Sequence, residues 1–107
     1  MKQWKRGKPF SPGAIIRILE RDNKQCVYCG SPAWMVDHVI PRRDNGPPIT
    51  SNGVAVCHRC NIRKGARMRE KYLVPAILHL MNCKEDVRWM DTHYGDSEAK
   101  EKRPGGG

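Results

Sequence analysis

The sequence has few of the residues that build a large apolar core. It contains one Phe among 107 residues, its aromatic fraction is 7%, and its hydrophobic fraction is 38%. No apolar run approaches the roughly 18 residues of a membrane-spanning helix, so we expect no membrane role. A chain of this length forms one domain, and a core this small often needs a covalent or metal staple.

Acidic residues are also scarce. The chain has 11 Asp and Glu against 20 Lys and Arg, which gives a formal net charge of +9. The excess is concentrated in residues 1–10, which carry no acidic side chain, and in residues 51–72, which carry one. Such an uneven basic charge favours a polyanion as partner, and nucleic acid is the commonest one; solubilising charge is the alternative.

Four of the five cysteines form two Cys-x-x-Cys pairs. The N-terminus has no apolar run typical of a signal peptide, so we expect reduced thiols and a cytoplasmic location, in a bacterium or a phage-infected host cell. Two such pairs supply the four thiolates that a tetrahedral Zn²⁺ prefers. The sequence therefore predicts a structural zinc site at Cys26, Cys29, Cys57 and Cys60, with disulfides or free thiols as alternatives. Cys83 is expected to be a small buried apolar residue.

Apolar periodicity and turn residues predict the order of elements. We expect a helix over residues 12–22, strands over 34–40 and 53–56 with an irregular loop over 42–51, and helices over 58–72, from 75 onward and over about 85–94. Pro75 separates the helix over 58–72 from the next one, because a proline disfavours helical conformation at the residue before it.

These elements predict one domain over residues 11–94. Residues 1–10 form a basic arm that suits a phosphate backbone, with a frayed terminus as the alternative. Residues 95–107 are polar and rich in glycine, and we expect them to be disordered.

A second group of residues carries chemistry that a closed zinc site cannot perform. A site with four protein ligands leaves no position for water or substrate. The carboxylate of Asp37 suits a hard divalent cation, and His38 has an ordinary pKa near neutrality, so it could activate water. Neighbours on a strand point to opposite faces, so both serve one site only if the strand twists or ends at His38.

The order and spacing of these residues resemble those of the HNH endonucleases, which have a ββα-metal fold. The matching residues are Cys26-x-x-Cys29-Gly30, Asp37-His38-Val39-Ile40-Pro41, Asn52 and Cys57-x-x-Cys60-Asn61-x-x-Lys64-Gly65. The resemblance implies a small α+β fold. Its ββα-metal (His-Me finger) core would hold a structural four-cysteine zinc site between an N-terminal helix and C-terminal helices.

The resemblance also implies a role for each residue. His38 matches the general base that takes a proton from water, and Asp37 matches a ligand of the catalytic divalent ion. Asn52 matches the central asparagine, which steadies the loop and orients the base. Asn61 would be the second metal ligand, and Lys64 is placed to meet a phosphate.

Gly53 departs from the family pattern. It follows Asn52 where relatives more often place an aliphatic residue, so we expect a looser hairpin at this point.

The function implied is a metal-dependent DNA endonuclease that leaves 5′-phosphate and 3′-hydroxyl ends. Zn²⁺ would stabilise the fold and Mg²⁺ or Mn²⁺ would serve catalysis, with activity rising through about pH 6 to 7 as His38 loses its proton. The predicted DNA contacts are Arg42, Arg43, Arg59, Arg63, Lys64 and Arg67. A monomer would nick double-stranded DNA with low sequence specificity, whereas a homodimer could cut both strands.

Two other functions stay open. The first is a non-catalytic zinc-ribbon module that binds nucleic acid or a protein. The second is an accessory nuclease within a phage DNA-packaging or mobile-element machine.

Overall fold

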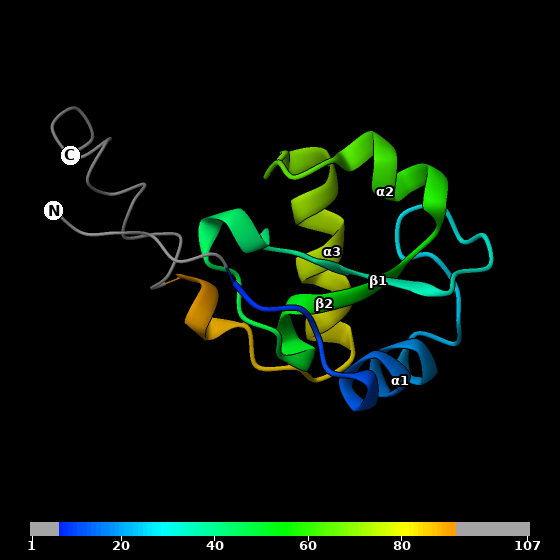
Figure 1. The fold of residues 1–107 in the computed structure, drawn as a ribbon, viewed down its shortest axis with the longest axis horizontal. Helices are drawn as coiled ribbons and strands as arrows, with labels where there is room; N and C mark the ends of the chain where they lie inside the picture. Colours follow the sequence, from blue (N-terminus) through cyan, green and yellow to red (C-terminus); the bar gives the residue numbers. More distant parts are fainter. Residues whose placement is uncertain (1–6, 92–107) are drawn as a thin grey trace, which may run out of the picture.

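The fold is a β-hairpin packed between helices, and a computed structural model describes it over residues 7–91 (Figure 1). In chain order the elements are α1 (Pro12–Arg21), β1 (Met35–His38), the 3₁₀ turns η1 (Arg42–Asp44) and η2 (Thr50–Asn52), β2 (Gly53–Val56), α2 (His58–Lys64) and α3 (Glu70–Asn82). This confirms the predicted small α+β class with flanking helices. The predicted tail over 95–107 and the first six residues of the basic arm lie outside the described residues.

The hairpin pairs β1 and β2 in antiparallel register, with Met35 opposite Val56 and His38 opposite Gly53. The predicted bounds of β2 are confirmed, whereas β1 is shorter than predicted. It ends at His38 because the next two amides both bond to Asn52. The N–H of Val39 donates to the carbonyl oxygen of Asn52, and the N–H of Ile40 donates to the side-chain oxygen of Asn52.

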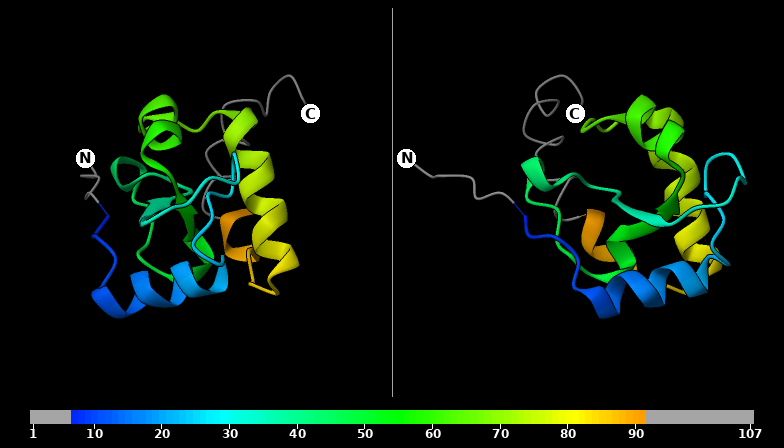
Figure 2. Two further views of the ribbon diagram at one scale, coloured as in Figure 1. Left: turned by 90° about the vertical axis from the view of Figure 1, so that its right-hand side faces the viewer. Right: turned by 45° about the vertical axis from the view of Figure 1, so that its right-hand side comes forward.

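Helices cover the hairpin from two sides (Figure 2). Residues of α1 and the segment before it pack against β1, and α3 packs against β2 and the hairpin tip. The buried residues on the α1 side are Phe10, Ala14 and Ile18, and those on the α3 side are Val39, Ile40, Val54, Ala76, Leu80 and Met90. No helix within residues 7–91 has the length and apolar character that crossing a bilayer requires.

The predicted helix over residues 58–72 is wrong, because the structure divides this stretch at Gly65. This glycine has a φ of +64°, which lies outside the helical region, and α2 ends just before it. The prediction that a helix starts at Pro75 is also wrong, since Pro75 lies inside α3. Tyr72, Ala76 and Leu80 are all buried at a spacing of four, and the packing of this face outweighs the local cost of the proline.

The last predicted helix, over about 85–94, is present in part. Residues 88–91 are helical, and residues 92–94 lie outside the described part of the chain.

A buried ion pair at the end of α1 joins three parts of the fold. The Asp22 side chain is 1% exposed, and its Oδ1 accepts hydrogen bonds of 2.7 Å from Nε of Arg21 and from Nε2 of His79 in α3. Its Oδ2 accepts from the N–H of Ala55 in β2 at 2.9 Å. Arg21 also donates to the carbonyl of Gly53 at 2.7 Å. The pair therefore links α1 to the hairpin and to α3.

We predict that Asp22→Asn lowers the free energy of unfolding by about 3 kcal/mol at pH 7, because it breaks a buried ion pair. Burial alone would raise the pKa of Asp22, but hydrogen bonds from Arg21, Ala55 and His79 outweigh it and lower the pKa. The lowered pKa means that this stabilisation is present above the pKa of an unfolded Asp, about 3.9, and is lost only in stronger acid.

Urea unfolding of the zinc-loaded protein from pH 7 down to about pH 5 measures this difference. The matched control is Asp86→Asn, which removes a carboxylate from an exposed pair with Arg88 and should leave the stability unchanged. An equal decrease in the free energy of unfolding in the two variants would contradict the role assigned to Asp22.

Candidate functional site

The four predicted zinc ligands come together in space. Their sulfur atoms all lie within 4.8 Å of one another, and the Sγ atoms of Cys29 and Cys57 are 3.6 Å apart. This separation is far longer than a disulfide bond of about 2.05 Å, and all five cysteines are free. Four thiols in a compact group suit a tetrahedral metal ion.

Local backbone geometry brings each pair of cysteines into position. In the first pair, Gly30 has a φ of +83° and its N–H donates to the carbonyl of Cys26, which closes the turn. In the second pair, Cys57 is the N-cap of α2 and its Sγ accepts from the N–H of Cys60. The cluster thus joins the chain before β1 to the start of α2.

The thiols of the cluster differ in acidity. Burial raises the pKa of Cys60 to about 12, whereas hydrogen bonds with Ser31, followed by one with Cys57, lower the pKa of Cys29 to about 6. A metal binds the thiolate form, so binding at Cys60 displaces a proton.

A second group of donor atoms, from Asp22, His79 and Cys83, also lies within 4.8 Å. Cys83, expected to be buried, is half-buried, with its Sγ 3.6 Å from Nε2 of His79. Both carboxylate oxygens of Asp22 already accept hydrogen bonds from Arg21, so we assign this group a structural role.

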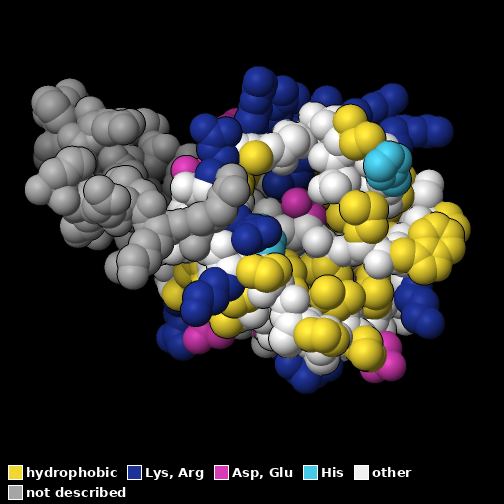
Figure 3. All heavy atoms as spheres, in the orientation of Figure 1, with side chains coloured by type: hydrophobic (Ala, Val, Ile, Leu, Met, Phe, Trp, Pro, Cys, Tyr) yellow, Lys and Arg dark blue, Asp and Glu magenta, His cyan; other side chains and the backbone are white. Residues whose placement is uncertain are grey.

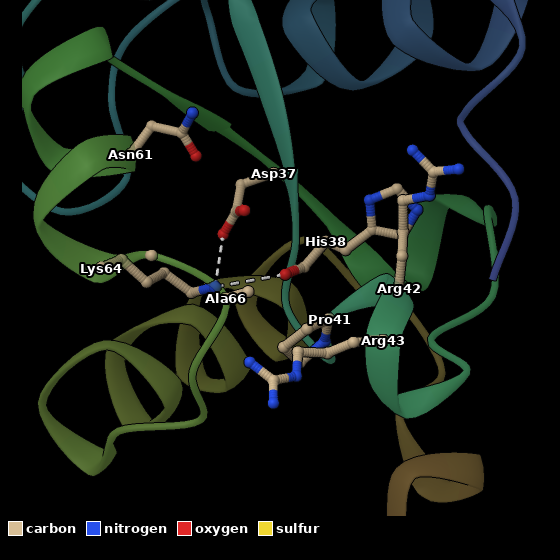
Figure 4. Close-up of a pocket in the computed structure, with 9 residues that line it drawn as sticks. Asp37, His38, Pro41, Arg42, Arg43, Asn61, Lys64 and Ala66 are labelled. Atoms are coloured by element: carbon tan, nitrogen blue, oxygen red, sulfur yellow. Dashed lines mark hydrogen bonds and ion pairs between the residues drawn. The ribbon is translucent and has the colours of Figure 1, made fainter. Parts of the chain in front are cut away.

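Four of the five predicted catalytic residues, all except Asn52, line one pocket of about 330 Å³ (Figure 4). The end of β1, the turn η1 and the helix α2 contribute its lining, which consists of Asp37, His38, Pro41, Arg42, Arg43, Asn61, Lys64, Gly65 and Ala66. Arg59, Arg63 and Arg67 do not line it and are exposed on α2 or just after it. Lys and Arg side chains gather over α2 at the top of Figure 3.

Asp37 and Lys64 form an ion pair at the floor of this pocket. The Nζ of Lys64 lies 2.9 Å from Oδ2 of Asp37 and 3.3 Å from the carbonyl oxygen of His38, and the Lys64 side chain is 2% exposed. Burial raises the pKa of Asp37, and the charge of Lys64 opposes this rise. The sequence did not predict this ion pair, and a phosphate contact of Lys64 stays a prediction.

Asp37 and Asn61 fit a hard divalent cation. The Asn61 side chain points toward Asp37 in Figure 4. Oδ2 of Asp37 is buried and, within the described chain, has no hydrogen bond of good geometry besides its ion pair. Carboxylate and amide oxygens are the ligands that Mg²⁺ and Mn²⁺ prefer.

His38 is the last residue of β1 and lines the same pocket as Asp37, and the two side chains leave the strand on opposite sides in Figure 4. Its Nε2 lies 3.0 Å from the carbonyl oxygen of Lys8, and its ring centroid is 4.2 Å from that of Phe10. Burial lowers the pKa of His38, and the Lys8 carbonyl partly offsets this. The lowered pKa favours the neutral ring that a general base needs.

Asn52 ties the hairpin tip together beneath the pocket. Its side chain is 0% exposed. Oδ1 accepts from the N–H of Ile40 at 2.8 Å, and Nδ2 donates to the carbonyls of Ile40 at 3.1 Å and Pro47 at 3.0 Å. Asn52 thus holds the backbone two residues after His38, while its effect on catalysis stays a prediction.

The space beside Gly53 is filled, although the sequence suggested a looser hairpin here. A Cβ at this position would lie 2.6 Å from Cδ1 of Ile18 and 2.8 Å from Cζ of Phe10. Sequence reasoning missed Lys8 and Phe10 as neighbours of the site; a lone Phe in a basic arm was the available signal.

Two comparisons with known proteins found similar stretches of sequence. Residues 26–67 match the protein-family model described as HNH endonuclease. The chain is also 50% identical over 52 residues to the CRISPR-associated endonuclease Cas9 of Corynebacterium diphtheriae. The similar stretch covers 44% of this chain and 5% of that relative, so the chain spans a small part of the relative's length. Lys8, Phe10 and Asp22 precede the family match.

We predict that Asn52→Ala lowers the free energy of unfolding by about 3 kcal/mol, because three hydrogen bonds are lost and buried backbone groups of Ile40 are left without partners. Chemical denaturation of the zinc-loaded protein measures the change. The matched control is Asn82→Ala at the exposed end of α3, which should have little effect. A loss at Asn52 no larger than the control would refute this role.

Proposed function

We propose that this chain, whose residues 26–67 form an HNH endonuclease domain, is a metal-dependent nuclease that hydrolyses phosphodiester bonds of DNA. The observation that carries the proposal is that Asp37, His38 and Asn61 all line one pocket, together with Arg42 and Arg43. A zinc-ribbon module that only binds nucleic acid would have no use for this arrangement.

The neutral imidazole of His38 takes a proton from water as the water oxygen attacks phosphorus. The bond from phosphorus to the 3′ oxygen breaks, and that oxygen takes up a proton, so a 5′-phosphate and a 3′-hydroxyl remain. Asp37 and Asn61 would hold Mg²⁺ or Mn²⁺, and such an ion stabilises negative charge on the phosphate and the departing oxygen. Lys64 opposes protonation of the buried Asp37 and so favours its charged, ligating form.

Basic residues support DNA as the substrate. Arg42 and Arg43 line the pocket, and Arg59, Arg63 and Arg67 are exposed nearby on α2 or just after it. Arginines suit the phosphate backbone, which carries no base information, so we propose low sequence specificity. We also propose that a monomer nicks one strand, because Asp37, His38 and Asn61 supply a single set of reactive groups per chain, and that the protein works in the reducing cytoplasm.

We predict that His38→Ala abolishes cleavage of supercoiled plasmid while zinc content and DNA binding stay unchanged. Wild type and variant are compared with Mg²⁺, with Mn²⁺ and with EDTA, and wild-type cleavage should disappear in EDTA. Cleavage by wild type should rise with pH as His38 loses its proton, with a midpoint below that of free imidazole, because burial lowers the pKa of His38. If the variant still cleaves the plasmid, the assignment of His38 as the general base is wrong.

We further propose that the four-cysteine cluster binds structural Zn²⁺. Cys60 directly precedes Asn61, and Cys57 caps the helix that carries Asn61 and Lys64, so the metal would fix the start of that helix.

We predict that Cys60→Ser reduces bound zinc from one ion per chain to less than one, with loss of cleavage and a lower Tm, although no residue of the pocket is changed. Elemental analysis and thermal unfolding provide the measurements. Cys83→Ser is the matched control, because this cysteine lies outside the cluster and should leave the zinc content at one. A full zinc complement in the Cys60 variant would contradict the proposed ligand set.

A further inference from the structure

The segment Gly7–Phe10 passes beside the end of β1, next to the imidazole of His38. It is drawn in dark blue in Figure 1 and runs on the His38 side of the pocket in Figure 4. The family match begins at residue 26, so this segment lies outside the matched residues. The sequence suggested an arm along a phosphate backbone, whereas residues 7–10 lie against the protein.

The contact with Lys8 determines which nitrogen of His38 carries the proton. A carbonyl oxygen only accepts hydrogen bonds, so the Nε2 that lies 3.0 Å from the Lys8 oxygen must be the donor. In a neutral imidazole with a proton on Nε2, the lone pair is on Nδ1. Nδ1 makes no hydrogen bond to residues 7–91, so it is available to a water molecule.

Phe10 fixes the position of the same ring. Its centroid lies 4.2 Å from that of His38, with 34° between the ring planes. Phe10 is 9% exposed and packs with Ala14 and Ile18 of α1. The Phe10 ring fills the space beside Gly53, which pairs with His38 across the hairpin. A side chain at position 53 would collide with this ring. The imidazole therefore rests on a ring that α1 holds in place.

Gly7 fastens the start of the segment to the hairpin tip. Its N–H donates to the carbonyl of Arg42 at 2.7 Å, and its own carbonyl accepts from Nε of Arg42 at 2.9 Å. A Cβ on Gly7 would collide with the carbonyl oxygen of Gly46. This fit admits no side chain at position 7, so the path of the backbone leading to Lys8 depends on the glycine.

We propose that Gly7–Phe10 is a positioning element of the active site, in which the Lys8 carbonyl keeps the proton on Nε2 of His38 and Phe10 holds the ring. Nδ1 is then the atom that receives the proton of the attacking water. This inference rests on the proposed nuclease function and extends it to residues outside the family match.

The first test is Gly7→Ala, with Gly13→Ala as matched control. The added methyl group must displace the segment in the first variant, whereas at Gly13 in α1 the nearest atom is the mobile Arg17 side chain at 3.4 Å. Nitrogen-15 NMR of the His38 ring, in zinc-loaded protein at a pH where the ring is neutral, reports the tautomer. We expect Nε2–H in wild type and in Gly13→Ala, and a mixture of tautomers in Gly7→Ala.

Kinetics give an independent readout. A misplaced base should lower kcat of Gly7→Ala by about ten- to hundredfold. A change in KM would report instead on the Arg42 side chain, which the Gly7 carbonyl holds. Phe10→Leu keeps an apolar side chain but removes the flat ring, and it should also lower kcat, so the inference stays testable if Gly7→Ala fails to fold. An unchanged tautomer and kcat in both variants would overturn the inference.

Truncations separate positioning from DNA binding. Removal of residues 1–6 takes away Lys2, Lys5 and Arg6, so it should raise KM while the His38 tautomer and kcat stay as in wild type. Removal of residues 1–9 also takes away the Lys8 carbonyl and should lower kcat. If wild type cuts no DNA, the proposed function fails, but the NMR comparison still decides whether Lys8 sets the tautomer.

Discussion

The closure of the four-cysteine cluster is the constraint on which the site depends. Cys26 and Cys29 precede β1, and Cys57 and Cys60 begin α2, so bringing the sulfurs within 4.8 Å fixes the start of the strand against the start of the helix. The strand carries the acid and the histidine, and the helix carries the asparagine and the lysine. The geometry of the pocket therefore depends on the cysteine cluster, although no cysteine lines the pocket.

Buried polar contacts replace much of the apolar core that this chain lacks. Asp22, Asn52 and Lys64 are each at most 5% exposed, and each bonds to a different part of the chain. Asp22 joins two helices to the hairpin, Asn52 closes the hairpin tip, and Lys64 holds the floor of the pocket. Hydrogen bonds are directional, so these contacts specify one arrangement of the helices and the hairpin. Apolar contacts in a core with a single Phe would specify that arrangement less well.

The sequence predicted which side chains lie together better than it predicted the contacts that support them. The spacing of the cysteines and the resemblance to the HNH endonucleases singled out four sulfurs that the structure brings into one cluster, and Asp37, His38 and Asn61, which line one pocket. Their chemical roles stay predictions. The helix bounds after residue 58 were wrong, since burial of one face carries α3 through Pro75. The Lys8 contact could not be predicted, because the acceptor is a backbone carbonyl that every residue possesses and the segment has no periodicity.

The N-terminal segment also bears on whether the proposed nuclease site can be transferred to another protein. Every side chain of the proposed catalytic set lies within the family match over residues 26–67, whereas Lys8, Phe10 and Asp22 come before it and α3 follows it. A graft limited to the matched stretch would transfer these side chains to another protein without the groups that hold them in position. The recipient protein would have to offer a carbonyl oxygen for the imidazole, an aromatic ring for the space over Gly53 and an apolar face in place of α3. Chimaeras should therefore be joined before Gly7 and after α3.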